Sequence, residues 1–177
     1  MHIAVYCGAN LGARPAYGAA ADALGTAIAD RGHDLVYGGG HVGLMGRVAD
    51  AVLAGGSRVT GVITEHLMKF EVSHERVTDL IVVPDMPTRK REMFERSDVF
   101  IALPGGVGTL EELFEVLCWR TLGLHEFPVG LLEVERYWAP MVDFLGRSVD
   151  EGFLAPRHLE ALVVTTDPDE LLDRLGC

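Results

Sequence analysis

This 177-residue sequence contains few cysteines and no long apolar segment. Cys7, Cys118 and Cys177 form neither a disulfide framework nor a metal-type spacing. No apolar run approaches the ~20 residues of a membrane-spanning helix, and Gly8 ends the run at 3–7 before it could form a signal core. These absences predict a cytoplasmic protein without a membrane partner. Cys7 and Cys118 are then expected to be small buried side chains.

Basic residues are also scarce. Lysine and arginine number 15 against 26 acidic residues, a net charge of −11. Nucleic-acid-binding proteins present a basic face to the phosphate backbone, so this balance argues against a nucleic-acid partner. A small anionic ligand is still allowed, because a few local cations and helix N-termini can hold it.

The sequence has no linker, internal repeat or low-complexity segment, so residues 1–177 are expected to form one domain. Short apolar runs alternate with longer helical segments, which is typical of βαβ units. We expect a Rossmann-like α/β fold, a doubly wound, mostly parallel sheet with helices on both faces, whose ligand lies at the C-terminal strand edge. Strands are expected at 3–7, 34–37, 58–63, 80–83, 99–103, 129–132 and 162–165, and helices at 15–31, 44–54, 87–97, 109–122, 137–151 and 169–175.

Three expected strand-to-helix turns, at 8–12, 38–40 and 105–108, carry glycine at this edge. The second begins a G-x-G-x-x-G spacing, which lets a backbone approach a phosphate and makes Gly39 and Gly40 candidate phosphate-binding residues. Alone, this spacing would indicate a dinucleotide-dependent oxidoreductase. It follows the second strand rather than the first, however, and Glu65 comes late for gripping a ribose. Tight helix–sheet packing explains the glycines about as well.

The third turn is the more specific signal. Backbone N–H groups of Gly105, Gly106, Gly108 and Thr109 would converge into a nest for an anion at a helix start. No G-K-[ST] follows, so a monophosphate fits better than ATP. Thr109-x-x-Glu112 also matches a capping box, which would give Glu112 a structural role. Beside a bound nucleotide, the same carboxylate could activate water or stabilise positive charge on the sugar.

A run of cations begins the helix expected at 87–97. Arg89, Lys90 and Arg91 lie in its first turn, where the helix dipole disfavours positive charge. The pairs Arg89–Glu92, Arg91–Glu95 and Glu92–Arg96 at helical spacing relieve this in part. Arg91 and Arg96 are expected to be solvated. Arg89 and Lys90 are candidate ligands of an anion, since a bound phosphate would remove the conflict.

Together, the glycine turn at 37–46, Arg89-Lys90 and the P-G-G-x-G-T-x-x-E motif at 104–112 resemble the LOG ("Lonely Guy") family of cytokinin riboside 5′-monophosphate phosphoribohydrolases. The resemblance covers nearly the whole chain. It implies hydrolysis of the N-glycosidic bond of an N6-substituted AMP, a small-molecule nucleotide monophosphate, to free base and ribose 5-phosphate. It also implies a homodimer with its active site near the interface, and neither metal nor cofactor.

The resemblance also assigns roles to residues. It implies catalytic roles for Arg89 and Glu112, and substrate contacts for Lys90 and Glu71. The phosphate would be held by Gly106, Gly108 and Thr109. The apolar helix expected at 109–122 suits a subunit contact as well as core packing.

Two departures from the family pattern bear on substrate preference. Ala9-Asn10 stands where many relatives carry Ser-Ser, and Pro87 stands where many carry histidine. The main alternative is a non-catalytic nucleotide or molybdenum-cofactor carrier of the same fold. A decarboxylase is the least favoured interpretation, because no lysine follows the pattern of a pyridoxal Schiff-base site.

Overall fold

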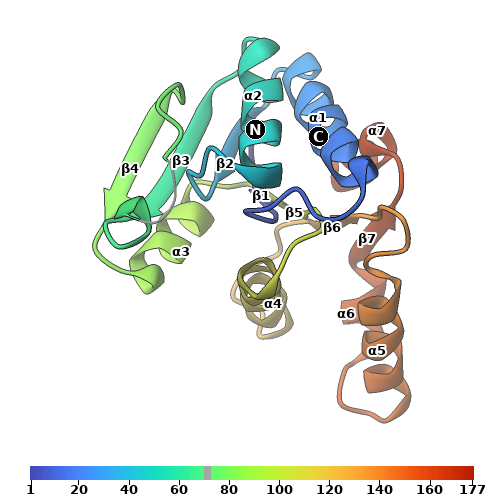
Figure 1. The fold of residues 1–177 in the computed structure, drawn as a ribbon. Coiled ribbons are helices and arrows are strands. Elements are labelled where there is room, and N and C mark those ends of the chain that lie inside the picture. The colour runs from blue at the N-terminus through green and yellow to red at the C-terminus, as the bar shows by residue number, and fades with distance from the viewer. Residues whose placement is uncertain (70–72) are drawn as a thin grey trace.

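The computed structural model describes residues 1–69 and 73–177 (Figure 1). Within these residues the strands form one sheet in the order β4-β3-β2-β1-β5-β6-β7, and every neighbouring pair is parallel. The α/β fold expected from the sequence is confirmed, with a sheet that is parallel throughout. The strands are β1 (His2–Tyr6), β2 (Asp34–Tyr37), β3 (Val59–Thr64), β4 (Asp79–Val83), β5 (Val99–Ala102), β6 (Val129–Leu132) and β7 (Leu162–Thr165).

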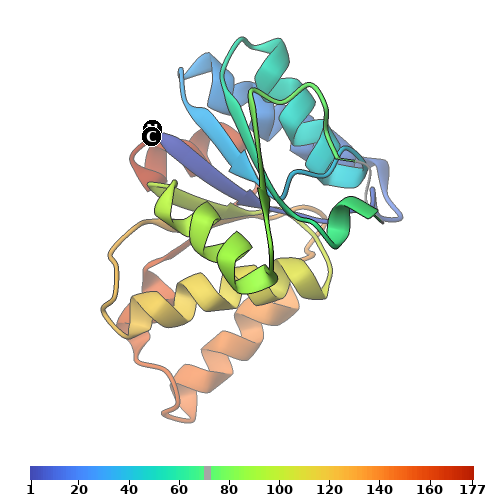
Figure 2. The ribbon, with the colours of Figure 1, turned by 90° about the vertical axis from the view of Figure 1, so that its left-hand side faces the viewer.

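Helices cover both faces of this sheet (Figures 1 and 2). They are α1 (Pro15–Asp30), α2 (Gly43–Ala54), α3 (Met86–Glu95), α4 (Val107–Thr121), α5 (Ala139–Asp150), α6 (Pro156–Glu160) and α7 (Pro168–Leu175), with a 3₁₀ turn, η1 (Leu67–Lys69). Residues of α1, α2 and α7 build the core on one face, and residues of α3 and α4 build the core on the other. The short helix α6 was not expected, because a segment of five residues is too short to show a helical periodicity.

Strand β1 lies in the middle of the sheet and is buried on both faces. Ile3 and Val5 point into the core beneath α1 and α2, whereas Ala4 and Tyr6 point into the core above α4. This alternation follows from the two-residue period of a strand, and it explains why the segment is a continuous apolar run.

The order of the strands reverses beside β1. From β1 the chain builds outward through β2 and β3 to β4, then returns to place β5 on the other side of β1. Tyr6 pairs with Ala102, so the two strands end level with each other. The turns that follow them touch where the Gly8 N–H donates to the Pro104 carbonyl oxygen at 3.1 Å. In a doubly wound sheet, such a reversal leaves a crevice for a ligand.

The cysteines follow the sequence expectation in one case only. Cys7 is buried under the first turn, as expected, but Cys118 is exposed, and its expected burial is wrong. Helix α4 buries Leu113 and Val116 against the sheet, and Cys118 lies on a different side of the helix. Among the described residues no helix is both apolar and long enough to cross a bilayer.

Candidate active site

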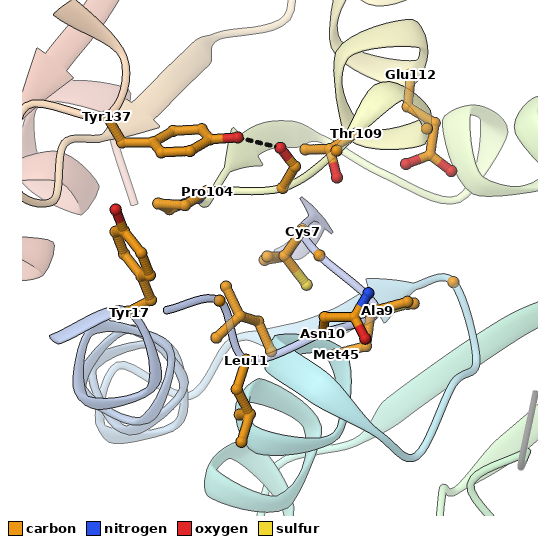
Figure 3. A pocket seen from close by; sticks show the side chains of 18 of the residues that line it. Cys7, Ala9, Asn10, Leu11, Tyr17, Met45, Pro104, Thr109, Glu112 and Tyr137 are labelled. Atoms are coloured by element: carbon orange, nitrogen blue, oxygen red, sulfur yellow. Dashed lines mark hydrogen bonds between the residues drawn. The ribbon is translucent and has the colours of Figure 1, made fainter. Parts of the chain in front are cut away.

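A pocket of about 500 Å³ opens at the crevice between β1 and β5 (Figure 3). Its size suits a small organic ligand. Its walls come from the turns after β1, β2 and β5, from α2, α3 and α4, and from Tyr17 and Tyr137. The lining residues are Val5, Cys7, Gly8, Ala9, Asn10, Leu11, Gly12, Tyr17, Gly38, Leu44, Met45, Met86, Arg89, Pro104, Gly105, Gly106, Gly108, Thr109, Glu112 and Tyr137.

Helix α4 begins two residues earlier than its sequence suggests. Gly106 is the N-cap residue, without a side-chain cap, and the first helical residue is Val107. The capping box expected at Thr109 is therefore wrong, because Thr109 is already the third residue of the helix. Glu112 lies in the second turn with its carboxylate directed into the pocket (Figure 3), and 11% of its side chain is exposed.

The three glycines of the bend before α4 differ in their surroundings. A methyl group on Gly105 would collide with the Thr109 side chain and lie 2.9 Å from the Gly8 nitrogen. At Gly106 and Gly108 a methyl group would meet no atom within 4 Å. The first N–H groups of a helix have no partner inside it, so this bend offers donors to an anion in open space. All four residues proposed from the third turn line the pocket.

Arg89 enters the pocket from α3, and its guanidinium is fixed by backbone carbonyls. Its Nε donates to the Val62 oxygen at 2.9 Å and its Nη2 donates to the Gly38 oxygen at 3.0 Å. A side chain at Gly38 would occupy the place of Nη2, so glycine is required there to admit the arginine. Only 6% of Arg89 is exposed. The remaining nitrogen, Nη1, lies 3.5 Å from Glu112 Oε1.

This ion pair shapes the electrostatics of the pocket floor. The distance between Arg89 Nη1 and Glu112 Oε1 exceeds the 2.7–2.9 Å typical of a charge-assisted hydrogen bond. Burial, and then the negative charge of Glu112, raise the pKa of the Tyr6 hydroxyl and of the Cys7 thiol. Both therefore keep their protons at neutral pH, and Cys7 is not a thiolate nucleophile.

The N-terminus of α3 is capped by an acidic side chain. Asp85 is the N-cap residue, and its carboxylate accepts the Thr88 N–H at 2.7 Å. This hydrogen bond lowers the pKa of Asp85. A fixed negative charge thus offsets the cations that follow. Of the three acid–base pairs expected along the helix, Glu92–Arg96 forms at 2.7 Å, while Arg89 turns to Glu112 instead of Glu92.

Lys90 does not line the described pocket, and its expected contact with the ligand stays a prediction. Its ammonium group binds the carboxylates of Glu111 and Glu115 on α4, the second at 2.7 Å. Burial alone would lower the pKa of Lys90, but these hydrogen bonds raise it above its ordinary value. Lys90 therefore joins α3 to α4.

The three glycines after β2 lie in different surroundings, and the expected role of Gly39 and Gly40 in binding phosphate stays a prediction. Gly38 borders the pocket, whereas Gly39 and Gly40 do not. Gly39 has φ +79° and packs against Ile63, and Gly40 bridges Ser73. These two glycines shape the backbone rather than the described pocket. Glu71, proposed to contact substrate, lies outside the described residues.

Several lining residues were missed by the sequence argument. Leu11 and Met45 lie inside two of the glycine turns but were not proposed as site residues. Tyr17 and Tyr137 lie in no motif, and the fold alone brings them into the pocket. Tyr137 is the clearest case: its hydroxyl donates to the carbonyl oxygen of Gly105, 32 residues earlier (Figure 3).

Outside the pocket, His41, Asp50 and His74 bring atoms able to ligate a metal within 4.8 Å of one another. His74 and Asp50, however, already form hydrogen bonds within the protein. The Arg76 N–H donates to His74 Nδ1, so Nε2 carries the ring proton and donates to Asp50 Oδ1 at 3.1 Å. The Arg76 side chain donates to the same oxygen at 2.5 Å. The cluster ties the segment before β4 to α2.

Comparison with known proteins adds independent findings. A protein-family model described as "Possible lysine decarboxylase" matches residues 45–175. The chain is 49% identical to a "Probable cytokinin riboside 5'-monophosphate phosphoribohydrolase" of Oryza sativa subsp. japonica, over 98% of this chain and 71% of that protein. It is 47% identical to a cytokinin riboside 5'-monophosphate phosphoribohydrolase of Arabidopsis thaliana, over 98% of this chain and 81% of that protein.

Solved structures share the fold at lower identity. A molybdenum cofactor binding protein from Rippkaea orientalis superposes with a TM-score of 0.73 at 23% identity, covering 99% of this chain and 94% of that one. The Moco carrier protein of Chlamydomonas reinhardtii gives 0.75 at 22% identity, with the same coverage of each chain. At this identity the likeness establishes the architecture alone.

Proposed function

The chain belongs to the LOG family of cytokinin riboside 5′-monophosphate phosphoribohydrolases, and on that premise we propose that it hydrolyses the N-glycosidic bond of N6-substituted AMP. The products are the free adenine-type base and ribose 5-phosphate. The single observation that carries this proposal is the meeting of Arg89 and Glu112 beside an open glycine bend in one pocket.

The phosphate binds at the start of α4. Backbone N–H groups of Gly106, Gly108 and Thr109 hold its oxygens, and the helix N-terminus adds favourable charge. Because Gly106 and Gly108 border open space, the phosphate can approach their backbone closely. Glu112 lies one helical turn beyond Thr109, which places a carboxylate next to the sugar of a nucleotide held by its phosphate.

Cleavage of the glycosidic bond places positive charge on the ribose as the base leaves with the electron pair of that bond. The Glu112 carboxylate stabilises this charge and orients a water molecule, whose oxygen joins the anomeric carbon. One proton of the water stays on the new hydroxyl group of ribose 5-phosphate, and the other ends on the departing base. Arg89 cannot serve as the proton donor, since a guanidinium does not lose its proton in proteins. Its role is to hold Glu112 and the substrate in position.

The decarboxylase description of the matching family model has no support in the pocket. Its described lining residues include no lysine, and Lys90 is held by two carboxylates on α4. The carrier function named for the two solved structures is the more serious alternative, because they share the fold. The buried Arg89–Glu112 pair favours the hydrolase, since binding a phosphate does not require a carboxylate beside it.

Free base released from nucleoside mono-, di- and triphosphates, measured by liquid chromatography, tests the proposal. The hydrolase releases base from AMP or isopentenyl-AMP in preference to the di- and triphosphates. A carrier binds nucleotide and releases no base. That second outcome would overturn the proposed reaction.

The proposal includes a homodimer. An apolar groove of about 280 Å³ runs between α4 and the α5–α6 segment. Its apolar lining residues include Phe114, Leu117, Leu145, Phe153, Leu154 and Leu159. Phe153 is 89% exposed and Phe114 39% exposed, and clustered exposed apolar side chains mark an interaction surface. A second copy of the chain covers this groove.

This placement puts the interface close to the reaction. Phe114 follows Thr109 by five residues on α4, a rise of about 8 Å along the helix. One helix therefore carries the phosphate site at its start and the subunit contact further along. We also propose a cytoplasmic location, because thiols such as the free Cys7, Cys118 and Cys177 stay reduced there.

A further inference from the structure

Two tyrosines close the end of the pocket that lies away from Glu112. Tyr17 comes from α1 and Tyr137 from the loop between β6 and α5, and their rings meet edge to face with centroids 5.8 Å apart. In Figure 3, Thr109 lies between this pair and Glu112. A phosphate on the glycine bend would therefore have the sugar on one side and the tyrosine pair on the other.

The loop that carries Tyr137 is held in an unusual conformation. Glu135 and Arg136 have φ of 54° and 60°, values that side-chain-bearing residues seldom adopt. Arg14, just before α1, forms an ion pair with Glu135 at 2.6 Å. The two segments that supply the tyrosines are thus joined twice, by charge and by ring contact. Strained backbone persists only where surrounding contacts determine it, and it often accompanies function.

Tyr137 also fixes the glycine bend. Its hydroxyl donates to the Gly105 carbonyl oxygen, which belongs to the same peptide group as the Gly106 N–H. In a trans peptide these two groups point in opposite directions. The hydrogen bond therefore sets the direction of the Gly106 N–H, away from Tyr137. A donor fixed before binding needs no ordering when the anion arrives.

This end of the pocket offers no free positive charge to a second phosphate. Among the described lining residues the one cation is Arg89, which pairs with Glu112 at the other end. Arg14, the nearest cation in sequence to Tyr17, is paired with Glu135. A β-phosphate would lose hydration against the two rings without gaining a charged partner.

Resting on the proposed function, we propose that Tyr17 and Tyr137 determine specificity for a single phosphate, and that Tyr137 is a positioning residue for the glycine bend. The rings of Tyr17 and Tyr137 form a wall at this end of the pocket, and this wall excludes the β-phosphate of a diphosphate. The hydroxyl of Tyr137 orients the donors that bind the one phosphate. These two roles belong to different parts of the same side chain, so they can be separated by substitution.

The experiment compares kcat/KM for base release from AMP and ADP in three variants. Tyr17→Ala/Tyr137→Ala opens the wall and raises the ADP-to-AMP ratio of kcat/KM by about 10-fold or more. Tyr137→Phe keeps the wall, leaves that ratio unchanged and raises KM for AMP about 2- to 10-fold with kcat preserved, as expected for one lost hydrogen bond. Val82→Ala, an exposed position on edge strand β4, is the control and behaves like the parent.

An unchanged ADP-to-AMP ratio in the folded double variant overturns the wall, and an unchanged KM in Tyr137→Phe overturns the positioning role. Circular dichroism confirms folding of each variant. If the parent protein releases base from no monophosphate, the proposed function fails. Calorimetric affinities for AMP and ADP in the same variants then test the wall by itself, because the double variant should gain affinity for ADP relative to AMP.

Discussion

Arg89 Nη1 lies 3.5 Å from Glu112 Oε1, so that α3 and α4, separate elements on one face of the sheet, meet through an ion pair at the floor of the pocket. Arg89 is anchored by the carbonyls of Val62 and Gly38, whereas Glu112 projects from the helix that begins at the glycine bend. The sheet, by placing α3 and α4 side by side, thus brings together the two side chains that the proposed reaction uses.

Glu112→Gln should abolish most base release while leaving AMP binding intact. The amide keeps the shape of the side chain but cannot stabilise positive charge on the ribose or accept a proton, so we expect kcat to fall about 10²- to 10⁴-fold. Chromatographic base release and calorimetric AMP affinity measure the two effects. Glu111→Gln is the matched control, since Glu111 pairs with Lys90 outside the pocket. Equal base release by Glu112→Gln and the parent would remove Glu112 from the mechanism.

Arg89→Lys should also lose activity, although it keeps the charge. A lysine ammonium cannot reproduce the planar fork that binds the Val62 and Gly38 carbonyls and faces Glu112 together. We expect kcat for base release from AMP to fall at least 10-fold. Arg91→Lys, on the exposed side of the same helix, serves as control and should match the parent. Full activity in Arg89→Lys would show that positive charge alone suffices.

The glycine bend allows stability and binding to be separated. Gly105→Ala forces a methyl group against the Thr109 side chain, and such overpacking costs about 1–3 kcal/mol, so thermal unfolding should occur at lower temperature. Gly106→Ala adds its methyl group to open space. It should keep the parent's unfolding temperature but raise KM for AMP, because the methyl group stands where phosphate binds. The reverse pattern would mean that the bend does not face the ligand.

Stability at alkaline pH should depend on Cys7. Burial, and then Glu112, raise the pKa of its thiol in the folded protein. In the unfolded chain the thiol ionises near its ordinary pKa of about 8.5, so above that pH the unfolded state binds fewer protons and gains stability relative to the folded state. Because of Cys7, the free energy of unfolding then falls by up to about 1.4 kcal/mol for each pH unit above that value. Urea unfolding between pH 8 and 10 should show a shallower decline for Cys7→Ala, and parallel declines would contradict this assignment.

The groove beside α4 predicts the assembly state. Leu117→Glu places a charge in the proposed contact between subunits, so light scattering after gel filtration should show monomers where the parent shows dimers. Val82→Glu adds the same charge to an exposed site on β4 and should remain dimeric. A parent protein that runs as a monomer would overturn the homodimer.

Most of the fold could be predicted from the sequence, because each strand is a short, largely apolar run and each long helix has its own periodicity. Side-chain direction was harder to predict. Arg89 and Lys90 are neighbours, and consecutive helix residues point about 100° apart, so one faces the pocket and the other faces α4. Three consecutive glycines gave no sign that only Gly38 makes room for an arginine from α3.

The start of α4 and the tyrosine pair show the same limit. A Thr-x-x-Glu spacing predicts a cap wherever it occurs, but here the glycines before it already adopt the conformation that begins the helix. Tyr17 and Tyr137 are 120 positions apart, and neither lies in a motif. Their contact depends on α1 and the β6–α5 loop meeting above the reversal of strand order, which only the assembled sheet provides.

The most direct measurement is a crystal structure of the Glu112→Gln protein with AMP. The account predicts the phosphate within hydrogen-bond distance of the Gly106, Gly108 and Thr109 N–H groups, and the anomeric carbon facing Arg89 and the side chain at position 112. AMP bound with its phosphate away from this bend, or with its sugar turned from Arg89 in both subunits, would contradict it.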